Sequence, residues 1–456
     1  MILKTAKILT ELQPHQKKAL LEALKGNRIL AHSTGSGKTL TAIAIADALN
    51  QPTTVLTPAS LVTNFEKELR KHKKGGPPIK VVSLPTAVER DLKIKPGSTL
   101  IIDEAHGLRN ADTKRNKYVK ELAEQAGRVY ALTGTPIYND PQDMAQLANV
   151  ISGGMAFTQG IKPYIRERRI PASWLDKLLY GVKDGVSYEL ANKDALKKIL
   201  NRYVDVFDKE IEKPQRVDEL IKVPMSPKQT EVYRYVTSKL PRDLMQKIRK
   251  NLPPTKSEVR MLNAFLTGAR QVANTTESYS VEGGEASPKL VAAASNLIKQ
   301  FAANPKARAL IYSNYLDSGI NSYGKLLEGA GIPYNKFNGS MSPKEKQKVV
   351  DEYNSGEVPV ILGSGSASEG LDLKNTRLIQ ILEPHFNESK IDQVIGRGIR
   401  YKSHEELPQE DRNVTVQRYL STIPNSGDTS IDEYLYSRAK DKQKIALAIK
   451  KMLTES

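Results

Sequence analysis

The sequence predicts an α/β protein with two parallel sheets and a mainly helical segment between them. Short, continuous apolar runs alternate with helical spacers through the first 133 residues, and the same alternation returns between about 309 and 382. Between about 152 and 285 this rhythm fades, and Lys and Arg become frequent. Apolar strands that alternate with helices are typical of a parallel sheet whose two faces are both covered.

Each apolar run predicts one strand. Five strands are expected in the first sheet, at residues 28–31, 54–56, 81–82, 99–102 and 129–132, and four in the second sheet, at residues 309–312, 334–337, 360–362 and 378–382. Every run ends in a polar or Gly/Pro-rich cluster, and ligands of such sheets bind beyond the carboxyl ends of the strands. The clusters of the first sheet are therefore expected to converge on one crevice.

The segment HSTGSGKT, residues 32–39, lies between the first expected strand and an expected helix over residues 40–49. A Gly-rich turn in this position directs backbone N–H groups and the positive end of a helix at one point, which binds phosphate. Gly35 and Gly37 let the backbone approach the anion. Lys38 supplies charge to the outer phosphates, and the Thr39 hydroxyl can hold Mg²⁺. The full pattern has Gly where His32 stands, so this chain carries a variant of the loop.

An acidic pair follows the expected strand at residues 99–102. Asp103 can hold the water shell of Mg²⁺, and Glu104 can orient and deprotonate the attacking water. His106 is placed to link the nucleotide site to its neighbours. One helix before the loop, the amide of Gln16 can donate to and accept from adenine.

The middle and the end of the chain give further expectations. Residues 180–188 predict a hairpin with a two-residue Asp184-Gly185 turn, residues 191–203 and 227–240 predict helices, and residues 282–285 predict a flexible link. Arg397 and Arg400 are expected on one face of a helix. The second sheet lacks a phosphate loop of its own. These arginines are therefore candidates for arginine fingers, which would stabilise the transition state of hydrolysis at the nucleotide bound by the first sheet.

Composition narrows the class of protein. The 456 residues carry a net charge of +18 with a pI near 9.5, which favours a polyanionic partner. There is no Cys, which excludes disulfides and thiolate zinc sites, and the six His show no metal-ligand spacing. No apolar run is long enough to span a bilayer and no signal peptide is evident, so no membrane is involved and an intracellular location is expected. For a phage or viral protein that location is the host cytoplasm.

The motifs in their order, HSTGSGKT, LTPASLVTNF, DEAHGLRN, LTGTPIYN, ALIYSN, SASEGLDL and QVIGRGIR, resemble those of superfamily 2 helicases and translocases. Within that superfamily, LTPASLVTNFEKEL, DEAHGLRN and LTGTPIYND resemble the Swi/Snf-like branch, although Phe65 stands where the branch usually has Trp. The stretch RYKSHEELPQEDRNVTVQRYL is similar to helicases of phages and large DNA viruses. The resemblance extends from about residue 12 to residue 445.

The resemblance implies two RecA-like lobes with ATP and Mg²⁺ between them. Lobe 1 is expected over residues 1–222, with a helical and hairpin excursion at about 152–213. Lobe 2 is expected over residues 223–456, with a helical insertion at about 223–285 and a last helix at about 430–455. By the family's pattern, two sets of residues bind or hydrolyse ATP. Those of lobe 1 are Gln16, Gly35, Ser36, Gly37, Lys38, Thr39, Asp103 and Glu104, and those of lobe 2 are Gly370, Asp372, Gln393, Arg397 and Arg400. By the same pattern, the DNA track includes Thr57, Pro58, Arg109, Asn110, Ser313, Asn314, Asn338, Gly339 and Ser364.

The function predicted on these grounds is an ATP-dependent DNA helicase or translocase that acts on duplex, forked or branched DNA in replication, recombination or repair. One alternative is a viral transcription-associated ATPase that displaces polymerase or transcripts with the same motor. A second is an RNA helicase, against which the Swi/Snf-like motifs argue. A third is an architectural DNA-binding protein with a degenerate ATPase site, against which the intact Lys38, Asp103, Glu104 and Arg397 argue. The protein partner that would recruit the motor is not apparent from the sequence.

Overall fold

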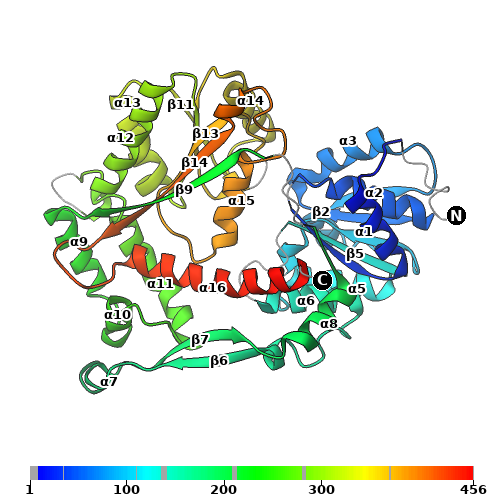
Figure 1. The fold of residues 1–456 in the computed structure, drawn as a ribbon, viewed down its shortest axis with the longest axis horizontal. Helices are drawn as coiled ribbons and strands as arrows, with labels where there is room; N and C mark the ends of the chain where they lie inside the picture. Colours follow the sequence, from blue (N-terminus) through cyan, green and yellow to red (C-terminus); the bar gives the residue numbers. More distant parts are fainter. Residues whose placement is uncertain are drawn as a thin grey trace. The chain divides into compact units, whose positions relative to one another are not determined.

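The computed structural model describes residues 9–33, 35–108, 110–134, 141–207, 213–279, 284–368 and 371–454 (Figure 1). The chain divides into two compact units. Unit 1 comprises residues 1–166, 189–211 and 442–456, and unit 2 comprises residues 167–188 and 212–441. The chain therefore passes between the units four times, whereas the sequence suggested a single boundary near residue 222.

Unit 1 contains a six-stranded sheet in the order β3-β2-β4-β5-β1-β8, in which every pair of neighbours is parallel. The strands are β1 (Arg28–His32), β2 (Thr53–Thr57), β3 (Ile79–Ser83), β4 (Thr99–Ile102), β5 (Arg128–Thr133) and β8 (Val204–Phe207). All five strands expected from the apolar runs are present. The sequence missed β8, a four-residue strand that returns after a long excursion to pair with β1.

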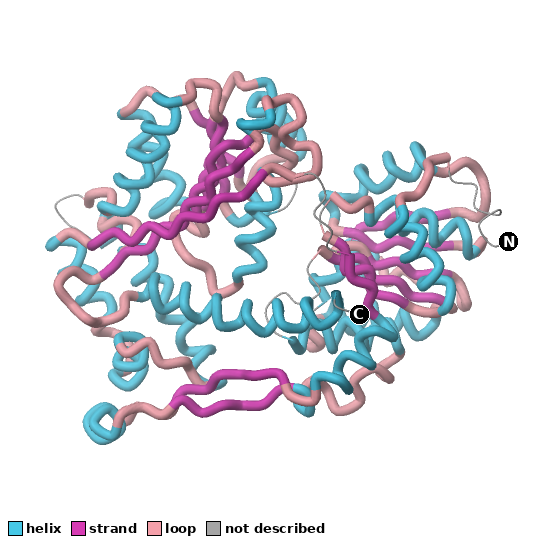
Figure 2. The backbone as a smooth tube through the Cα atoms, viewed as in Figure 1, coloured by secondary structure: helices cyan, strands magenta, loops and turns pink. Residues whose placement is uncertain are grey.

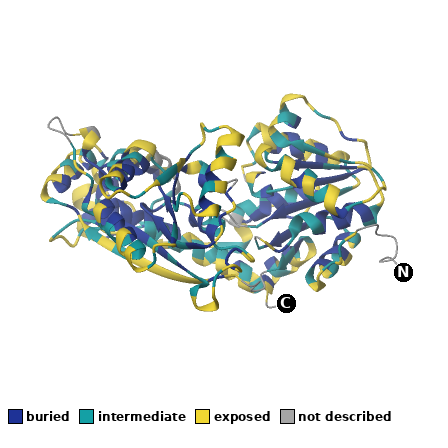
Figure 3. Cartoon of the chain, turned by 90° about the horizontal axis from the view of Figure 1, so that it is seen from above, coloured by how far each residue is buried: buried dark blue, intermediate teal, exposed yellow. Residues whose placement is uncertain are grey.

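Helices cover both faces of this sheet (Figure 1). They are α1 (Pro14–Lys25), α2 (Lys38–Leu49), α3 (Val62–His72), α4 (Leu84–Glu89), α5 (Lys114–Gln125), α6 (Pro141–Ser152) and α8 (Lys193–Tyr203). Because successive strand residues point to opposite faces, Ile29 enters the core that includes residues of α5, α6 and α8, while Leu30 enters the core beneath α1 and α2. Figure 3 shows the resulting burial of the strands between more exposed helices.

Unit 2 contains a second six-stranded parallel sheet, in the order β11-β12-β10-β13-β14-β9. Its strands are β9 (Gln215–Pro224), β10 (Arg308–Tyr312), β11 (Tyr334–Phe337), β12 (Val360–Gly363), β13 (Thr376–Ile381) and β14 (Asn413–Thr422). The helices packed around it are α12 (Pro288–Ala303), α13 (Ser322–Gly329), α14 (Pro343–Ser355) and α15 (Glu388–Gly398). The four expected strands are present, and two parallel sheets with helices confirm the predicted fold class.

A helical insertion completes unit 2. Its helices α9 (Pro227–Thr237), α10 (Arg242–Arg249) and α11 (Lys256–Val272) share a core with the first turns of α16 (Ile431–Thr454), to which Ile431 and Tyr434 contribute. The last turns of α16 belong to unit 1, where Ile449 and Leu453 enter the core of the first sheet. One 24-residue helix thus supplies core residues to both units.

The segment that the sequence predicted as a tight hairpin has a different structure. The strands β6 (Ile165–Ile170) and β7 (Gly185–Leu190) form a two-stranded ribbon (Figure 2), and the helix α7 (Trp174–Tyr180) lies between them in the chain. The expected Asp184-Gly185 turn is therefore wrong, because Gly185 begins β7 and the partner strand lies upstream of α7. Among the described residues, no helix is long and apolar enough to cross a membrane.

Candidate nucleotide-binding site

The phosphate loop follows β1 and leads directly into α2, as the sequence predicted. Gly35 and Gly37 have φ angles of +85° and +77°, a region that favours glycine. A Cβ atom on Gly37 would also lie 2.5 Å from Nε2 of Gln16. The backbone conformation therefore favours glycine at position 37, and a larger residue would also displace the amide of Gln16. Thr34 lies outside the described residues.

The loop holds polar groups that a phosphate could use. Nζ of Lys38 donates to the carbonyl oxygens of His32 and Ser33, at 2.9 Å and 3.4 Å. The hydroxyl oxygens of Ser33 and Ser36 are shielded from solvent, and neither has a hydrogen-bond partner in the described part of the chain. An anion in the loop would supply the acceptor that these hydroxyl groups lack, so the donor set fits the phosphates of ATP.

Asp103 lies immediately beyond β4, and its carboxylate is held in place by the neighbouring strand. Oγ1 of Thr57, the last residue of β2, donates to Oδ2 of Asp103 at 2.9 Å, and the backbone N–H of Glu104 donates to Oδ1. Burial, assisted by the adjacent Glu104 carboxylate, raises the pKa of Asp103 to about 6. A buried carboxylate with a raised pKa gains from a nearby cation, which is the role predicted for Mg²⁺ at this position.

Glu104 has a positive φ of 47°, which is unusual for a residue other than glycine and is frequent at functional sites. Oε2 of Glu104 lies 3.1 Å from Nδ1 of His106, on the following 3₁₀ turn Ala105–Leu108. The backbone conformation of Glu104 and the proximity of His106 therefore both bear on the direction of the Glu104 carboxylate. The neighbour of His106 is thus a residue of the nucleotide site itself, and the link to other elements stays a prediction.

The residues present fit a magnesium ion as well as a nucleotide. Thr39, in the first turn of α2, and Asp103 offer hydroxyl and carboxylate oxygens, the ligands that Mg²⁺ prefers. Within the described ranges no group of three or more His, Cys, Asp or Glu could hold a metal ion. In the usual Mg²⁺ site of an ATPase one or two protein ligands suffice, and phosphates and waters supply the rest.

Gln16 occupies a different environment from the one predicted. Its side chain is 3% exposed, its Nε2 donates to the carbonyl oxygens of Ser36 and Gly37 at 3.4 Å and 3.2 Å, and its Oε1 accepts from the backbone N–H of Gln13. In this conformation the amide braces the phosphate loop rather than presenting both edges to adenine. A part in nucleotide recognition would require the amide to exchange these partners.

A network of rings and one carboxylate beside the loop was not predicted. His32 is fully buried, and its Nε2 lies 2.7 Å from Oδ2 of Asp205 on β8. His15 of α1 stacks on Phe207 with ring centroids 3.7 Å apart, and its Nε2 contacts the carbonyl oxygen of Ser36 at 2.9 Å. The unusual His at the start of the motif was the only sequence signal of this network, and its partner Asp205 is 173 residues away.

The residues predicted to serve ATP from the second lobe lie in and around α15 of unit 2. Gln393 and Arg397 are on α15, which ends at Gly398. Arg400 is therefore beyond the helix, and the prediction that both arginines share one helical face is wrong. Nη1 of Arg400 lies 2.8 Å from Oδ1 of Asp372, so these two predicted site residues form an ion pair. Gly370 lies outside the described residues.

Seven of the predicted DNA-track residues fall into two groups. The side chains of the first group are buried: Thr57 is bonded to Asp103, Ser313 donates to Glu383 at 3.0 Å, and Ser364 is 6% exposed. Glu383 is fully buried and also accepts from the side chain of Asn314. The second group, Pro58, Asn110, Asn338 and Gly339, reaches the surface. Arg109 lies outside the described residues. The first group is thus placed to shape the loops rather than to touch DNA with side chains.

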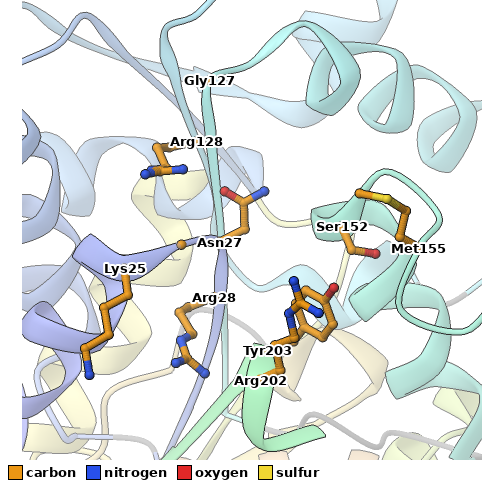
Figure 4. A pocket seen from close by; sticks show the side chains of 10 residues that line it. Lys25, Asn27, Arg28, Gly127, Arg128, Ser152, Met155, Arg202 and Tyr203 are labelled. Carbon is orange, nitrogen blue, oxygen red and sulfur yellow. The ribbon is translucent and has the colours of Figure 1, made fainter. Parts of the chain in front are cut away.

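A separate hollow of unit 1 lies at the other edge of the sheet, where β1 and β5 begin (Figure 4). Its volume of about 360 Å³ would accept a small ligand. Two of its cations already have partners, because Arg28 contacts Glu22 at 2.8 Å and Lys25 contacts the same carboxylate at 2.5 Å. Since the phosphate loop follows the opposite, carboxyl end of β1, this hollow is not the nucleotide site.

A phosphate loop and an acidic pair on one parallel sheet, with a second sheet in the same chain, define a P-loop ATPase of the two-lobed class. Residues 83–278 match the model of the SNF2-related domain, and residues 291–402 match that of the helicase conserved C-terminal domain. The chain is 34% identical to "Putative ATP-dependent RNA helicase L538" of Acanthamoeba polyphaga mimivirus, over 95% of this chain and 94% of that protein. It therefore belongs to the SNF2-related family of superfamily 2 helicases and is an ATP-hydrolysing enzyme.

Other relatives extend the comparison. "Termination factor NPH-I homolog" of African swine fever virus (isolate Tick/South Africa/Pretoriuskop Pr4/1996) is 25% identical, over 93% of this chain and 75% of that protein. The structure is also similar to the Sulfolobus solfataricus SWI2/SNF2 ATPase core in complex with dsDNA. That similarity has a TM-score of 0.39 and 20% sequence identity, and it covers 100% of this chain and 97% of the other.

Proposed function

We propose that the protein is an ATP-driven translocase that tracks along duplex or branched DNA. The observation that carries this proposal is the phosphate loop and acidic pair of unit 1 in a chain whose residues 83–278 match the SNF2-related domain. In this proposal Lys38 binds the outer phosphates, Glu104 activates the attacking water, and Mg²⁺ is held by Thr39 and Asp103. Work in replication, recombination or repair inside an infected host cell is part of the same proposal.

The charge of the protein supports a nucleic-acid substrate. A net charge of +18 favours association with a phosphate backbone. Binding releases counterions from the nucleic acid, and because this release is less favourable at high salt concentration, binding should weaken steeply as salt is added. A motor must accept every sequence that it meets, so contacts to phosphates are expected to dominate over contacts to bases.

The test is ATP hydrolysis measured with duplex DNA, single-stranded DNA, forked DNA and duplex RNA in parallel. The proposal expects the largest stimulation with duplex or forked DNA. It also expects displacement of a third strand from a DNA triplex, which reports translocation without strand separation. Stimulation by RNA alone would contradict the proposal and favour the function in the name of the mimivirus relative.

A second candidate function is favoured by the swine fever virus relatives, whose name is that of a termination factor. The same motor, moving on template DNA, could displace a stalled polymerase or its transcript. Release of labelled transcript from stalled elongation complexes, compared between the wild-type protein and Lys38→Ala, would distinguish this task. ATP-dependent release would assign the motor to transcription, while triplex displacement without release would favour replication, recombination or repair.

A further inference from the structure

The helix α7 presents four large apolar side chains to solvent. Trp174, Leu175, Leu178 and Leu179 are 70%, 47%, 72% and 66% exposed. They stand at positions i, i+1, i+4 and i+5 of the chain, and these positions lie on one side of an α-helix. We call these four residues the α7 surface. A contiguous apolar patch of this kind is a mark of an interaction site, because scattered single residues account for most exposed apolar side chains.

The opposite side of α7 is firmly anchored. Asp176 is 9% exposed, and it accepts hydrogen bonds from Oγ of Ser173 at 2.6 Å and from Nε2 of Gln246, on α10, at 2.8 Å. Ala172 and Val182, on either side of the helix in the chain, are buried. The exposed apolar residues are therefore not the result of a loosely attached helix, because the polar and small residues of the same segment are held inward.

A second set of contacts fixes the chain after α7. Lys247, which is fully buried, donates to a carboxylate oxygen of Glu258 at 2.7 Å and to the carbonyl oxygen of Asp184 at 3.4 Å. Gly185 lies so close to Pro253 that a Cβ atom would be 2.8 Å from the proline ring. Through these contacts with Lys247 and Pro253, the chain that follows α7 packs against the helical insertion of unit 2.

The segment that carries the α7 surface is basic, because residues 162–184 contain six Lys or Arg and three Asp or Glu. Asp184 accepts from Lys177 at 2.7 Å and from the backbone N–H of Ala172. Arg169 and Lys250 are exposed and close enough to Asp184 and Asp176, respectively, to help keep the pKa of each carboxyl low, after the hydrogen bonds that those carboxylates accept. The segment around the α7 surface thus carries a net positive charge.

We propose that the α7 surface docks a partner protein through an amphipathic segment that has an apolar face and acidic flanks. Three of the four side chains are leucines, which bury well against protein but do not stack on bases as aromatic side chains do. Acidic flanks complement the positive charge of the segment that carries the α7 surface. A second copy of this chain fits poorly, since two chains of charge +18 would bring like charges together. The docking site goes beyond the motor function, because no residue of the ATP site takes part.

Trp174 makes the proposal directly testable, since it is the only Trp of the chain. Its fluorescence in the full-length protein would be followed during titration with a panel of helix-forming peptides. These would carry Leu at positions i, i+3, i+4 and i+7 and Glu elsewhere, and a matched panel would carry Lys for Glu. We expect the acidic panel to shift the emission to shorter wavelength in a saturable manner, and the basic panel to bind at least tenfold more weakly.

The double variant Leu175→Ser/Leu178→Ser retains Trp174 and should weaken binding of the acidic peptide at least tenfold. The matched control is Leu21→Ser, which removes a leucine of α1 that is 43% exposed and lies far from α7 in the chain. It should bind like the wild type. The temperature of unfolding and the ATPase rate should stay unchanged in both variants, which separates loss of docking from loss of folding.

Four outcomes would overturn the proposal. The first is that no acidic peptide changes the emission, and the second is that the double variant binds as tightly as the wild type. The third is a shift of Trp174 emission with forked DNA but not with the peptides, which would assign the surface to nucleic acid. The fourth is concentration-dependent sedimentation that the double variant abolishes, which would assign it to a second copy of the chain.

Discussion

Nε2 of His32 and Oδ2 of Asp205 lie 2.7 Å apart and connect the first residue of the phosphate loop to the edge strand β8. Asp205 is 13% exposed at its side chain and His32 is fully buried. The position at which the general loop pattern has glycine therefore carries a side chain with a structural partner. After β8 the chain enters unit 2 at residue 212, so this contact joins the loop to the strand that leads out of unit 1.

Asp205→Ala should lower the free energy of unfolding by about 1–3 kcal/mol, because it leaves the buried His32 ring without its partner. Denaturant unfolding measures this quantity. Glu121→Ala, which removes an exposed carboxylate from α5, is the matched control and should change stability by less than about 0.5 kcal/mol. Equal stabilities of Asp205→Ala and the control would show that the contact contributes nothing.

Glu104→Gln should preserve ATP binding and lower turnover by about 10²- to 10⁴-fold, because an amide cannot accept the proton of the attacking water. Binding of a fluorescent ATP analogue and steady-state phosphate release give the two readings. The exposed Glu89, at the end of α4, provides the control substitution Glu89→Gln, which should leave both unchanged. Wild-type turnover by Glu104→Gln would remove Glu104 from the role of general base.

Arg397→Ala should slow ATP hydrolysis by about 10³-fold or more if Arg397 acts as an arginine finger, with DNA binding in the absence of nucleotide largely retained. Lys402→Ala, an exposed cation past the end of α15, is the control for loss of positive charge. Loss of DNA affinity with normal hydrolysis would instead place Arg397 on the DNA track.

The stability of unit 2 should fall as the pH drops below about 6.5. His404 is 2% exposed and its ring contacts the carbonyl oxygen of Thr376 at 2.7 Å, and burial, with the charges of Arg377 and Arg412, lowers its pKa from the ordinary 6.5. Below pH 6.5 His404 therefore binds a proton in the unfolded chain but not in the folded chain. The free energy of unfolding is thus highest above pH 6.5 and declines below it.

Denaturant unfolding of the wild type and of His404→Asn between pH 7.5 and pH 5 would measure this decline. One proton contributes at most about 1.4 kcal/mol per pH unit, and His404→Asn should have the shallower slope even if it is less stable throughout. Identical slopes would mean that His404 does not control the pH response.

The strands and loops that the sequence predicted correctly are those whose signals are local. Residues 99–102, before Asp103, form a continuous apolar run, and the polar cluster follows directly. The sequence therefore predicted both the strand and the site residues at its end. In contrast, β9 lies at the edge of its sheet and is mostly exposed, and β14 alternates buried and half-buried residues, so neither has a continuous apolar run. Contacts between distant residues, such as those of Asp205 and Gln16, have no local signature, and the fixed position of α7 depends on residues of α10.

The division of unit 1 along the chain has a consequence for how the protein is made. Its core includes Ile449 and Leu453, which are synthesised only after the main part of unit 2, residues 212–441. At ribosomal rates of about 5–20 residues per second, roughly 15–60 s separate residue 166 from these side chains. During that interval the core of unit 1 lacks two of its apolar side chains. Nascent chains of this protein should accordingly recruit chaperones to the ATP-binding unit, and should release them only when the last turns of α16 have left the ribosome.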